Sequence, residues 1–249
     1  MKRALLVLRR DYREMKATTA FRIMIVVAAG ITVAAAALIS ILLHRQSWYG
    51  AEEARPVIDI ITGITAYFLP LIVLMSFIWA FASFPVVREK VKGNIDCLIA
   101  TPVTPGELLA GKGLAVFIPA YLISLAAMVV IVAAVNLAVI LPGWHSIMLP
   151  WPALVLGLAV SPLLFLSLLL ITLQMSFTGN PDSAVAPSMI VGFGLMVGMP
   201  VGLATGFFDI NSWLFVLWYT VGTTVAWGVV LALNRSLTRQ NIVLSEKGG

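Results

Sequence analysis

Charged residues are scarce in this sequence, and their scarcity decides its class. They make up 11% of the 249 residues, apolar residues make up 61%, and the mean hydropathy is +1.03. Ordinary soluble domains contain roughly 25% charged and 45–50% apolar residues. The composition therefore excludes a soluble domain and predicts a protein embedded in the lipid bilayer. The net charge of +5 indicates membrane orientation, and we expect no binding to nucleic acid.

Cysteine and histidine are also scarce, which excludes several kinds of site. Cys97 is the single cysteine, so no disulfide can form within the chain. Neither His44 nor His145 has a Cys, an Asp or a second His at metal-ligand spacing. No nucleophile and base can be paired within the apolar segments. We predict no metal site, no catalytic site and no cofactor in this chain, and hence that it is not itself an enzyme.

Long apolar runs are what the sequence has instead. A membrane-spanning helix needs about 20 apolar residues, and the chain is long enough for six such helices with short loops. We predict an all-α polytopic membrane protein, with 1–249 forming a single transmembrane domain. The predicted spans are 20–43, 59–83, 113–141, 152–174, 186–207 and 213–234.

The third apolar run is too long for one perpendicular helix. From Glu107 to Leu141 it covers 35 residues, or roughly 52 Å, against a hydrocarbon core of about 30 Å. We expect its first turns to lie in the interface, with Lys112 extending to the headgroups. Pro119 is the expected site of a bend.

The N-terminal segment has the pattern of an amphipathic helix. Over 2–19, its apolar residues fall largely on one face at helical spacing, and its basic residues fall on the other. Such a helix lies in the headgroup plane, and we predict an interfacial helix. The alternative is a merely basic leader before the first span.

The distribution of Lys and Arg predicts the orientation. Residues 1–22 contain seven, the segment 88–112 contains four, the C-terminal tail contains three, and the loops on the opposite side contain two. Positive loops face the cytoplasm, so we predict a multi-pass protein of the cell membrane with both termini cytoplasmic. The expected outer loops contain the interfacial tryptophans Trp48, Trp144, Trp151 and Trp213.

The spans themselves contain almost no ionisable residues. Ion-coupled transporters use such groups within the membrane, so their scarcity weighs against a self-contained secondary transporter. The chain also has no room for an ATPase domain. Transport would therefore be passive, or its energy would arrive through a partner at the cytoplasmic face.

One polar stretch, Arg88 to Lys112, stands between the second and third spans and contains seven charges. Within it, Asn94 is a good N-cap for a short helix, and Thr101-Pro102 would end that helix. Ile95, Leu98 and Ile99 would share one face. The pattern suits docking on a soluble partner, and the alternative is an ordinary charged cytoplasmic loop.

The residue order of this stretch, R-E-K-x-x-G-x-I-D-x-L-x-x-T-P-V-x-x-x-E-L-L-x-G-K, resembles the loop after the second membrane helix of type-2 permeases of ATP-binding cassette exporters. In that family the loop contains a coupling helix that sits in a groove of a separate ATPase subunit. The resemblance implies a cytoplasmic coupling loop over 88–112, a homodimer or heterodimer of permeases, and ATP and Mg bound by the partner ATPase. The implied ATPase-contacting residues are Glu89, Gly93, Ile95, Asp96, Leu98, Ile99, Thr101 and Pro102.

A phosphate-binding motif is nearly matched within the same stretch. Gly106 to Lys112 fits most of G-x-x-x-x-G-K-[ST], but Gly113 stands where the hydroxyl for Mg²⁺ is required. Pro102 and Pro105 also break up any strand that would precede it. We therefore expect no phosphate site here.

Glycines recur every four residues in the fifth span, at Gly194, Gly198, Gly202 and Gly206. At that spacing they line one helix face and permit close contact with another helix. The face either packs within the subunit or forms a seam along a transport path or between two subunits. In the resembled family, the first and fifth helices line the space between the two permeases.

Together these features favour the permease subunit of an ATP-binding cassette exporter, moving an amphipathic substrate outward. The first alternative is a stand-alone channel or carrier, which would stay active alone in liposomes. The second is a membrane-embedded enzyme that turns over a lipid or peptide without ATP. The sequence does not identify the substrate.

Cys97 tests the predicted orientation. We expect a membrane-permeant thiol reagent to modify it in intact cells and an impermeant reagent to leave it unmodified, because the loop faces the cytoplasm. Inside-out vesicles, in which both reagents should react, are the control. Modification of intact cells by the impermeant reagent would contradict the orientation and the docking hypothesis together.

Overall fold

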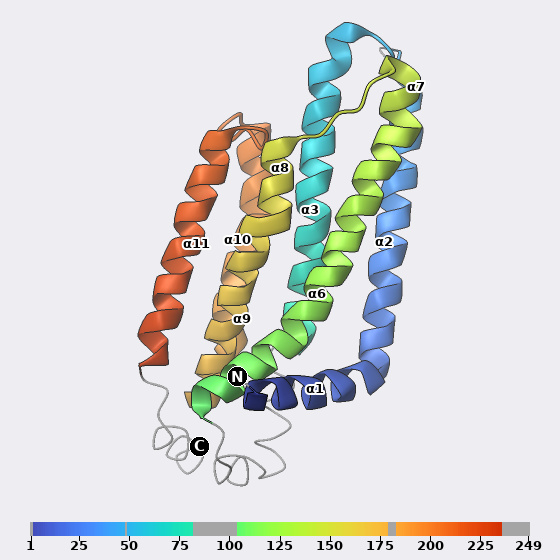
Figure 1. Ribbon diagram of the computed structural model, residues 1–249. Helices are drawn as coiled ribbons and strands as arrows, with labels where there is room; N and C mark the ends of the chain where they lie inside the picture. The colour runs from blue at the N-terminus through green and yellow to red at the C-terminus, as the bar shows by residue number, and fades with distance from the viewer. Residues whose placement is uncertain (1, 48, 82–103, 179–182, 236–249) are drawn as a thin grey trace.

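The computed structural model describes residues 2–47, 49–81, 104–178 and 183–235, and all regular structure in these ranges is helical (Figure 1). Six helical stretches within them are long and apolar enough to cross a membrane. For the described residues, the prediction of an all-α protein with six helices long and apolar enough to span a membrane is therefore confirmed. Beyond its first turn, the peptide donors of such a helix bond within the helix itself, as hydrocarbon surroundings require.

The structure bounds the spans as follows. α2 is Thr19–His44, and the second span combines a short 3₁₀ turn, η1 (Glu52–Ala54), with α3 (Arg55–Phe81). The third combines α6 (Pro105–Val135), the π-helical η2 (Asn136–Ile140) and α7 (Leu141–Trp144). The fourth combines α8 (Trp151–Val155), the π-helical η3 (Leu156–Val160) and α9 (Ser161–Thr178). A 3₁₀ turn, η4 (Ser183–Val185), precedes α10 (Ala186–Ala204), and α11 is Trp213–Asn234.

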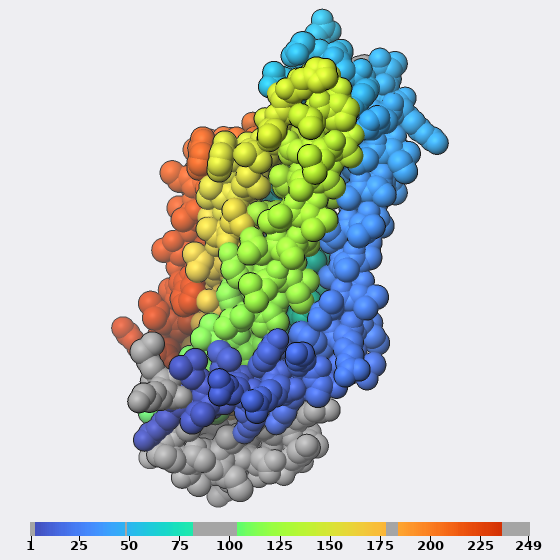
Figure 2. All heavy atoms as spheres, turned by 45° about the vertical axis from the view of Figure 1, so that its right-hand side comes forward, coloured from blue at the N-terminus to red at the C-terminus, as the bar shows by residue number. Residues whose placement is uncertain are grey.

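The N-terminal helix α1 (Lys2–Ala17) runs across one end of the bundle, at a steep angle to the six long helices. Figure 2 shows it lying along the base of α6 and continuing into α2. Thr18 separates α1 from α2, and its hydroxyl donates to the Met15 carbonyl (2.6 Å) and accepts from the Phe21 amide (3.3 Å). This N-cap fixes the elbow between the two helices.

The core of the bundle is formed by α3, α6 and α9. Its largest fully buried apolar side chains include Tyr67, Phe77, Phe165 and Phe177. By contrast, most of α2, α10 and α11 is exposed in the isolated chain, since less than a third of each span is buried. Those three helices therefore present the apolar surface that remains for lipid or for a partner.

A cluster of hydroxyl groups lies inside this apolar core. Tyr67 of α3 donates to Tyr219 of α11 (3.2 Å), and Ser161 of α9 donates to the same Tyr219 oxygen (3.4 Å). The residues Tyr67 and Ser161 are almost completely buried. Hydrogen bonds between helices satisfy polar groups that water cannot reach, so this cluster ties α3, α9 and α11 together.

The fifth span ends earlier than predicted. α10 stops at Ala204, whereas the prediction extended it to residue 207. Gly206 takes a left-handed conformation (φ +70°), and the amides of Phe207 and Phe208 turn back to the Gly202 carbonyl at 2.8 and 3.2 Å. Glycine adopts this conformation without strain and ends helices for that reason.

Two polar contacts hold the opposite end of the bundle. Asn211, in the turn after α10, donates to the Asp59 carboxylate of α3 (2.7 Å). Tyr49 donates to the Val139 carbonyl of η2 (2.9 Å) and stacks on His44. Burial raises the pKa of the Tyr49 phenol, so it stays a donor at any physiological pH. Trp48, one of the predicted interfacial tryptophans, lies outside the described residues.

Candidate functional site

The candidate site is the contact between α1 and residues 104–112 at the start of α6, which we call the α1–α6 junction. It contains the described end, residues 104–112, of the polar stretch singled out in the sequence. The predicted docking residues Glu89, Gly93, Ile95, Asp96, Leu98, Ile99, Thr101 and Pro102 lie outside the described residues. What the structure describes are the two stems of that stretch, α3 and α6.

The start of α6 is fixed by a capping box. The Thr104 hydroxyl accepts from the Glu107 amide (3.2 Å), and the Glu107 carboxylate accepts from the Thr104 amide (3.2 Å). Pro105 occupies the first helical position, where its missing donor costs nothing. The helix therefore begins at Pro105, two residues before the predicted start at Glu107, and the last eight residues of the polar stretch belong to it.

Gly111 allows α1 to lie close against α6. A Cβ atom at this position would stand 2.8 Å from the Ala4 carbonyl oxygen and 2.8 Å from Val7 Cβ. The carbonyl belongs to the backbone, so it cannot yield as a flexible side chain would. At Gly106, one and a half turns earlier, a Cβ would meet no atom of the described chain within 4 Å. Gly111 is thus the position where a side chain would separate the two helices.

A buried ion pair joins the two helices at the next residue. Lys112 Nζ lies 3.1 Å from Asp11 Oδ2, and the side chains are 0% and 5% exposed. The expectation that Lys112 extends to the headgroups is wrong. An ammonium group in a protein interior needs a carboxylate nearby, and α1 supplies one. No local pattern in the sequence indicates this contact, because 101 residues separate the two partners.

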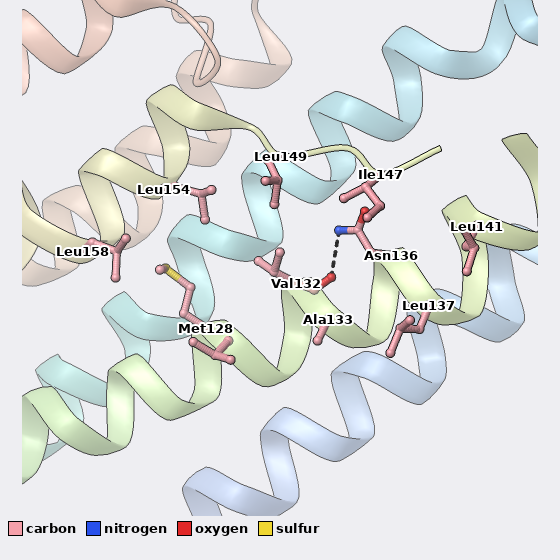
Figure 3. Close-up of a pocket in the computed structure, with 11 residues that line it drawn as sticks. Met128, Val132, Ala133, Asn136, Leu137, Leu141, Ile147, Leu149, Leu154 and Leu158 are labelled. Carbon is pink, nitrogen blue, oxygen red and sulfur yellow. Dashed lines mark hydrogen bonds between the residues drawn. The ribbon is translucent and has the colours of Figure 1, made fainter. Parts of the chain in front are cut away.

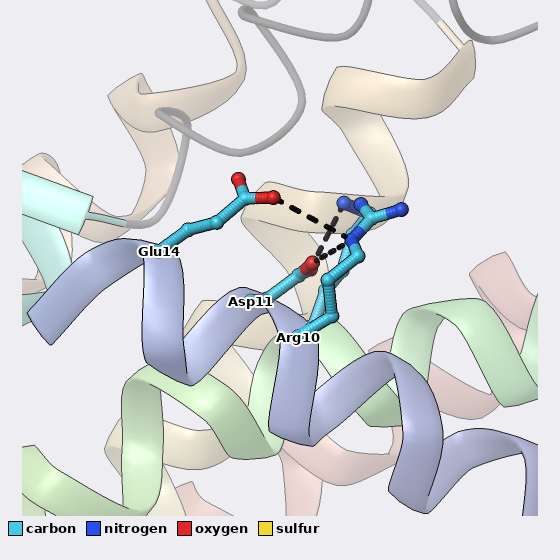
Figure 4. Close-up of polar contacts among 4 residues, drawn as sticks. Arg10, Asp11 and Glu14 are labelled. Atoms are coloured by element: carbon cyan, nitrogen blue, oxygen red, sulfur yellow. Dashed lines mark hydrogen bonds and ion pairs between the residues drawn. The ribbon is translucent and has the colours of Figure 1, made fainter. Parts of the chain in front are cut away.

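Two further charges of α1 surround the Asp11 carboxylate (Figure 4). Arg10 Nε donates to Asp11 Oδ1 (3.0 Å), so each carboxylate oxygen has its own cationic partner. Arg10 Nε also lies 3.8 Å from Glu14 Oε1, an exposed contact one helical turn away. Among the residues that the structure describes, this group contains two cations, Arg10 and Lys112, and two anions, Asp11 and Glu14.

The same geometry bears on the phosphate-binding motif. Residues Gly106 to Lys112 lie in continuous α-helix, whereas a phosphate loop exposes its backbone amides to the ligand. The Lys112 ammonium, which would have to reach a phosphate, points at Asp11 instead. The near-match therefore reflects helix packing.

The α1–α2 elbow also contacts the other stem of the polar stretch. Phe21, one turn into α2, packs edge-on against Phe77 and Phe81 at the end of α3, with ring centroids 6.0 and 6.2 Å apart. Phe81 is the last described residue before the polar stretch, and Lys112, which contacts Asp11 of α1, is the last residue of that stretch. A single helical elbow thus touches both stems.

The glycines of the fifth span do not share one environment. Gly194 and Gly198 are exposed, and a Cβ at either would meet nothing in the described chain within 4 Å. Gly202 packs against Phe208 in the same chain, and Gly206 lies beyond the helix. The face at Gly194 and Gly198 is therefore open in the isolated chain.

Sequence reasoning assigned no contact to Gly192, the glycine at which α10 packs against α3. A Cβ at Gly192 would contact Met75, and it would lie 2.9 Å from Trp79 Cζ2. Gly192 falls outside the four-residue repeat, so the repeat did not indicate this contact. Among the residues that the structure describes, no three His, Cys, Asp or Glu side chains gather in a group that could bind a metal ion.

The Asp11–Lys112 pair predicts a specific mutational pattern. Asp11→Asn removes the buried carboxylate beside the Lys112 ammonium and should lower the free energy of unfolding by about 3–5 kcal/mol. The double variant Asp11→Leu, Lys112→Met removes both charges and should recover most of that loss. Thermal unfolding of the purified chain in detergent is the measurement.

Glu14→Gln is the matched control, because Glu14 is an exposed acidic residue of the same helix. Its contact with Arg10 should be worth at most about 1 kcal/mol. If Asp11→Asn were no more destabilising than Glu14→Gln, the pair would not be a buried structural contact.

Comparisons with known proteins identify no relative of this chain. No family model, no curated protein and no solved structure matches it. Its function must therefore be inferred from its own residues and their geometry.

Proposed function

We propose that the chain is the membrane-spanning permease subunit of an ATP-binding cassette exporter and works with a separate ATPase subunit. Two permease copies, identical or different, would form the transmembrane part. The ATPase would supply ATP and Mg binding, and this chain would convert ATPase movement into movement of its helices.

The observation that carries the proposal is the polar stretch Arg88–Lys112, by its sequence and by its place in the chain. Its residue order resembles the coupling loop of type-2 permeases, and it joins α3 to α6. A soluble partner that pulled on such a loop would act on both stems. Two contacts support this view, because they couple each stem to α1 or α2. Phe21 of α2 packs against Phe81 of α3, and Asp11 of α1 pairs with Lys112 of α6.

The α1–α6 junction suggests how movement is passed on. A displacement of Pro105 would be transmitted along α6. It would also reach α1, because the two helices are in close contact at Gly111. The buried Asp11–Lys112 contact resists sliding, since separating two charges in a low-dielectric site is costly. α1 and the start of α6 would therefore move as one body.

The inferred substrate is amphipathic, and the direction of transport is outward. Within the described spans, charged side chains such as Asp59 and Lys112 lie near the helix ends, so the path offers few fixed charges to an ion. In this proposal the protein spans the cell membrane with both termini in the cytoplasm. The open faces of α2 at Gly30 and of α10 at Gly194 and Gly198 would meet across the two subunits.

Leu98→Asp tests ATPase docking. The substitution places a charge on the apolar face predicted for the coupling helix, and burying that charge at an interface is strongly unfavourable. We expect co-purification with the ATPase to be lost while membrane insertion stays normal. Leu98→Met, which conserves volume and polarity, should retain the ATPase. Equal recovery of the ATPase with both variants would sink the docking hypothesis.

Gly198→Cys tests the subunit seam. In a Cys97→Ser background we expect disulfide-linked dimers through Gly198→Cys, and also through Gly30→Cys on α2. Gly228→Cys is the matched control, because it is an equally open glycine on α11 and lies outside the proposed seam. Dimers formed through Gly228→Cys, with none through Gly198→Cys, would assign the interface to α11 instead.

A further inference from the structure

We infer that a groove between the third and fourth spans is a binding site for one acyl chain of a membrane lipid. The groove lies between α6–η2 on one side and α8–η3 on the other, below the segment 145–150 (Figure 3). Its volume is about 460 Å³, which falls within the roughly 300–1,000 Å³ range of ligand pockets. This inference stands apart from the proposed transport function.

The groove presents only apolar surface. The one polar side chain in its wall, Asn136, uses its amide elsewhere: its nitrogen donates to the carbonyls of Val132 (2.9 Å) and Met148 (3.0 Å), and its oxygen accepts from the Met148 amide (2.9 Å). A trapped water needs two to four polar partners, and this groove offers none. Its occupant must be apolar.

A π-helical segment contributes to each wall of the groove. η3 supplies Leu158 at the end near Met128, and η2 supplies Asn136 and Leu137 toward the opposite end (Figure 3). Such segments leave local backbone groups to be satisfied, and they recur at functional sites. In η3, Tyr121 donates to the Leu158 carbonyl (3.0 Å), and Asn136 has a similar role at η2. The Leu158 and Val132 carbonyls therefore have side-chain donors, and the groove surface stays apolar.

The groove opens sideways, onto the surface that faces the bilayer. Val129, Leu137 and Ile147 along its rim are 57%, 67% and 71% exposed. An occupant can therefore enter from the membrane plane without a passage through the protein. A transmembrane helix is about 10–12 Å across with its side chains, so a hollow of this size fits one aliphatic chain better than a helix of a neighbouring protein.

The length and position of the groove match one leaflet. From Leu141 to Met128 it follows the helix for roughly 20 Å at 1.5 Å per residue, about half of a bilayer 40–45 Å thick. Trp151, which is 62% exposed, begins α8 three residues before the groove-lining Leu154, and tryptophan marks the headgroup level. A lipid whose headgroup lay beside Trp151 would extend its chain along the groove.

Photolabelling tests the inference. The full-length chain is reconstituted in phosphatidylcholine vesicles that contain a phospholipid with a diazirine midway along one acyl chain. Labelled residues are then located by mass spectrometry. We expect Met128, Val132 and Leu158 to be labelled severalfold more than Val225 and Leu231, which are exposed on α11 and line no part of the groove. Labelling that is equal at both sets would overturn the inference without any variant.

Ala133→Phe fills the groove from its wall and should remove most of the labelling at Met128 and Leu158. Ala138→Phe is the matched control, an exposed alanine one turn away that does not line the groove, and it should leave the labelling unchanged. If Ala133→Phe had no effect, or if a photoreactive residue at position 133 cross-linked to a second protein chain, the groove would not be a lipid site.

Discussion

The contact between Lys112 and Asp11 is the constraint on which the arrangement at this end of the molecule depends. A buried ammonium group is stabilised by a carboxylate beside it, and α1 lies where Asp11 reaches Lys112. That contact sets the position of α1 across the base of α6, and the elbow at Thr18 then sets the direction of α2. Replacing such a pair by apolar residues often costs little. What the pair provides is therefore one defined register between α1 and α6.

Lipid surroundings account for most of the remaining architecture. Without water to compete, polar groups within the spans turn to their own backbone, as when the Thr62 and Thr172 hydroxyls donate to carbonyls four residues earlier. Other polar side chains join separate elements: Tyr67 with Tyr219, Asn211 with Asp59, and Asn136 with Met148. Each ties elements that apolar packing alone would leave free to slide.

Sequence reasoning could find the spans because their signal is local. A short window of sequence is enough to recognise twenty successive apolar residues, a proline before a helix or a glycine after one. The same rules could have predicted that α10 ends before Gly206. The pairing of Asp11 with Lys112 could not be predicted by those rules, because a buried cation of a membrane protein looks the same in sequence as an interfacial one. The glycine repeat shows which residues share a spacing, but it does not show what each one contacts. The structure shows that Gly192 and Gly202 pack against side chains, whereas Gly194 and Gly198 are open. The coupling residues from Glu89 to Pro102 stay a prediction from resemblance.

Tyr67 and Tyr219 meet although 152 residues separate them. During synthesis α3 enters the membrane long before α11 has been made, so the Tyr67 hydroxyl first lies in hydrocarbon without this partner. Helices that have inserted one by one must then find one another within the bilayer. The last helix completes the hydroxyl cluster of α3, α9 and α11. A chain cut short before α11 would insert its first five spans and still lack the contact that draws them together, so biogenesis of the bundle finishes only when its last helix arrives.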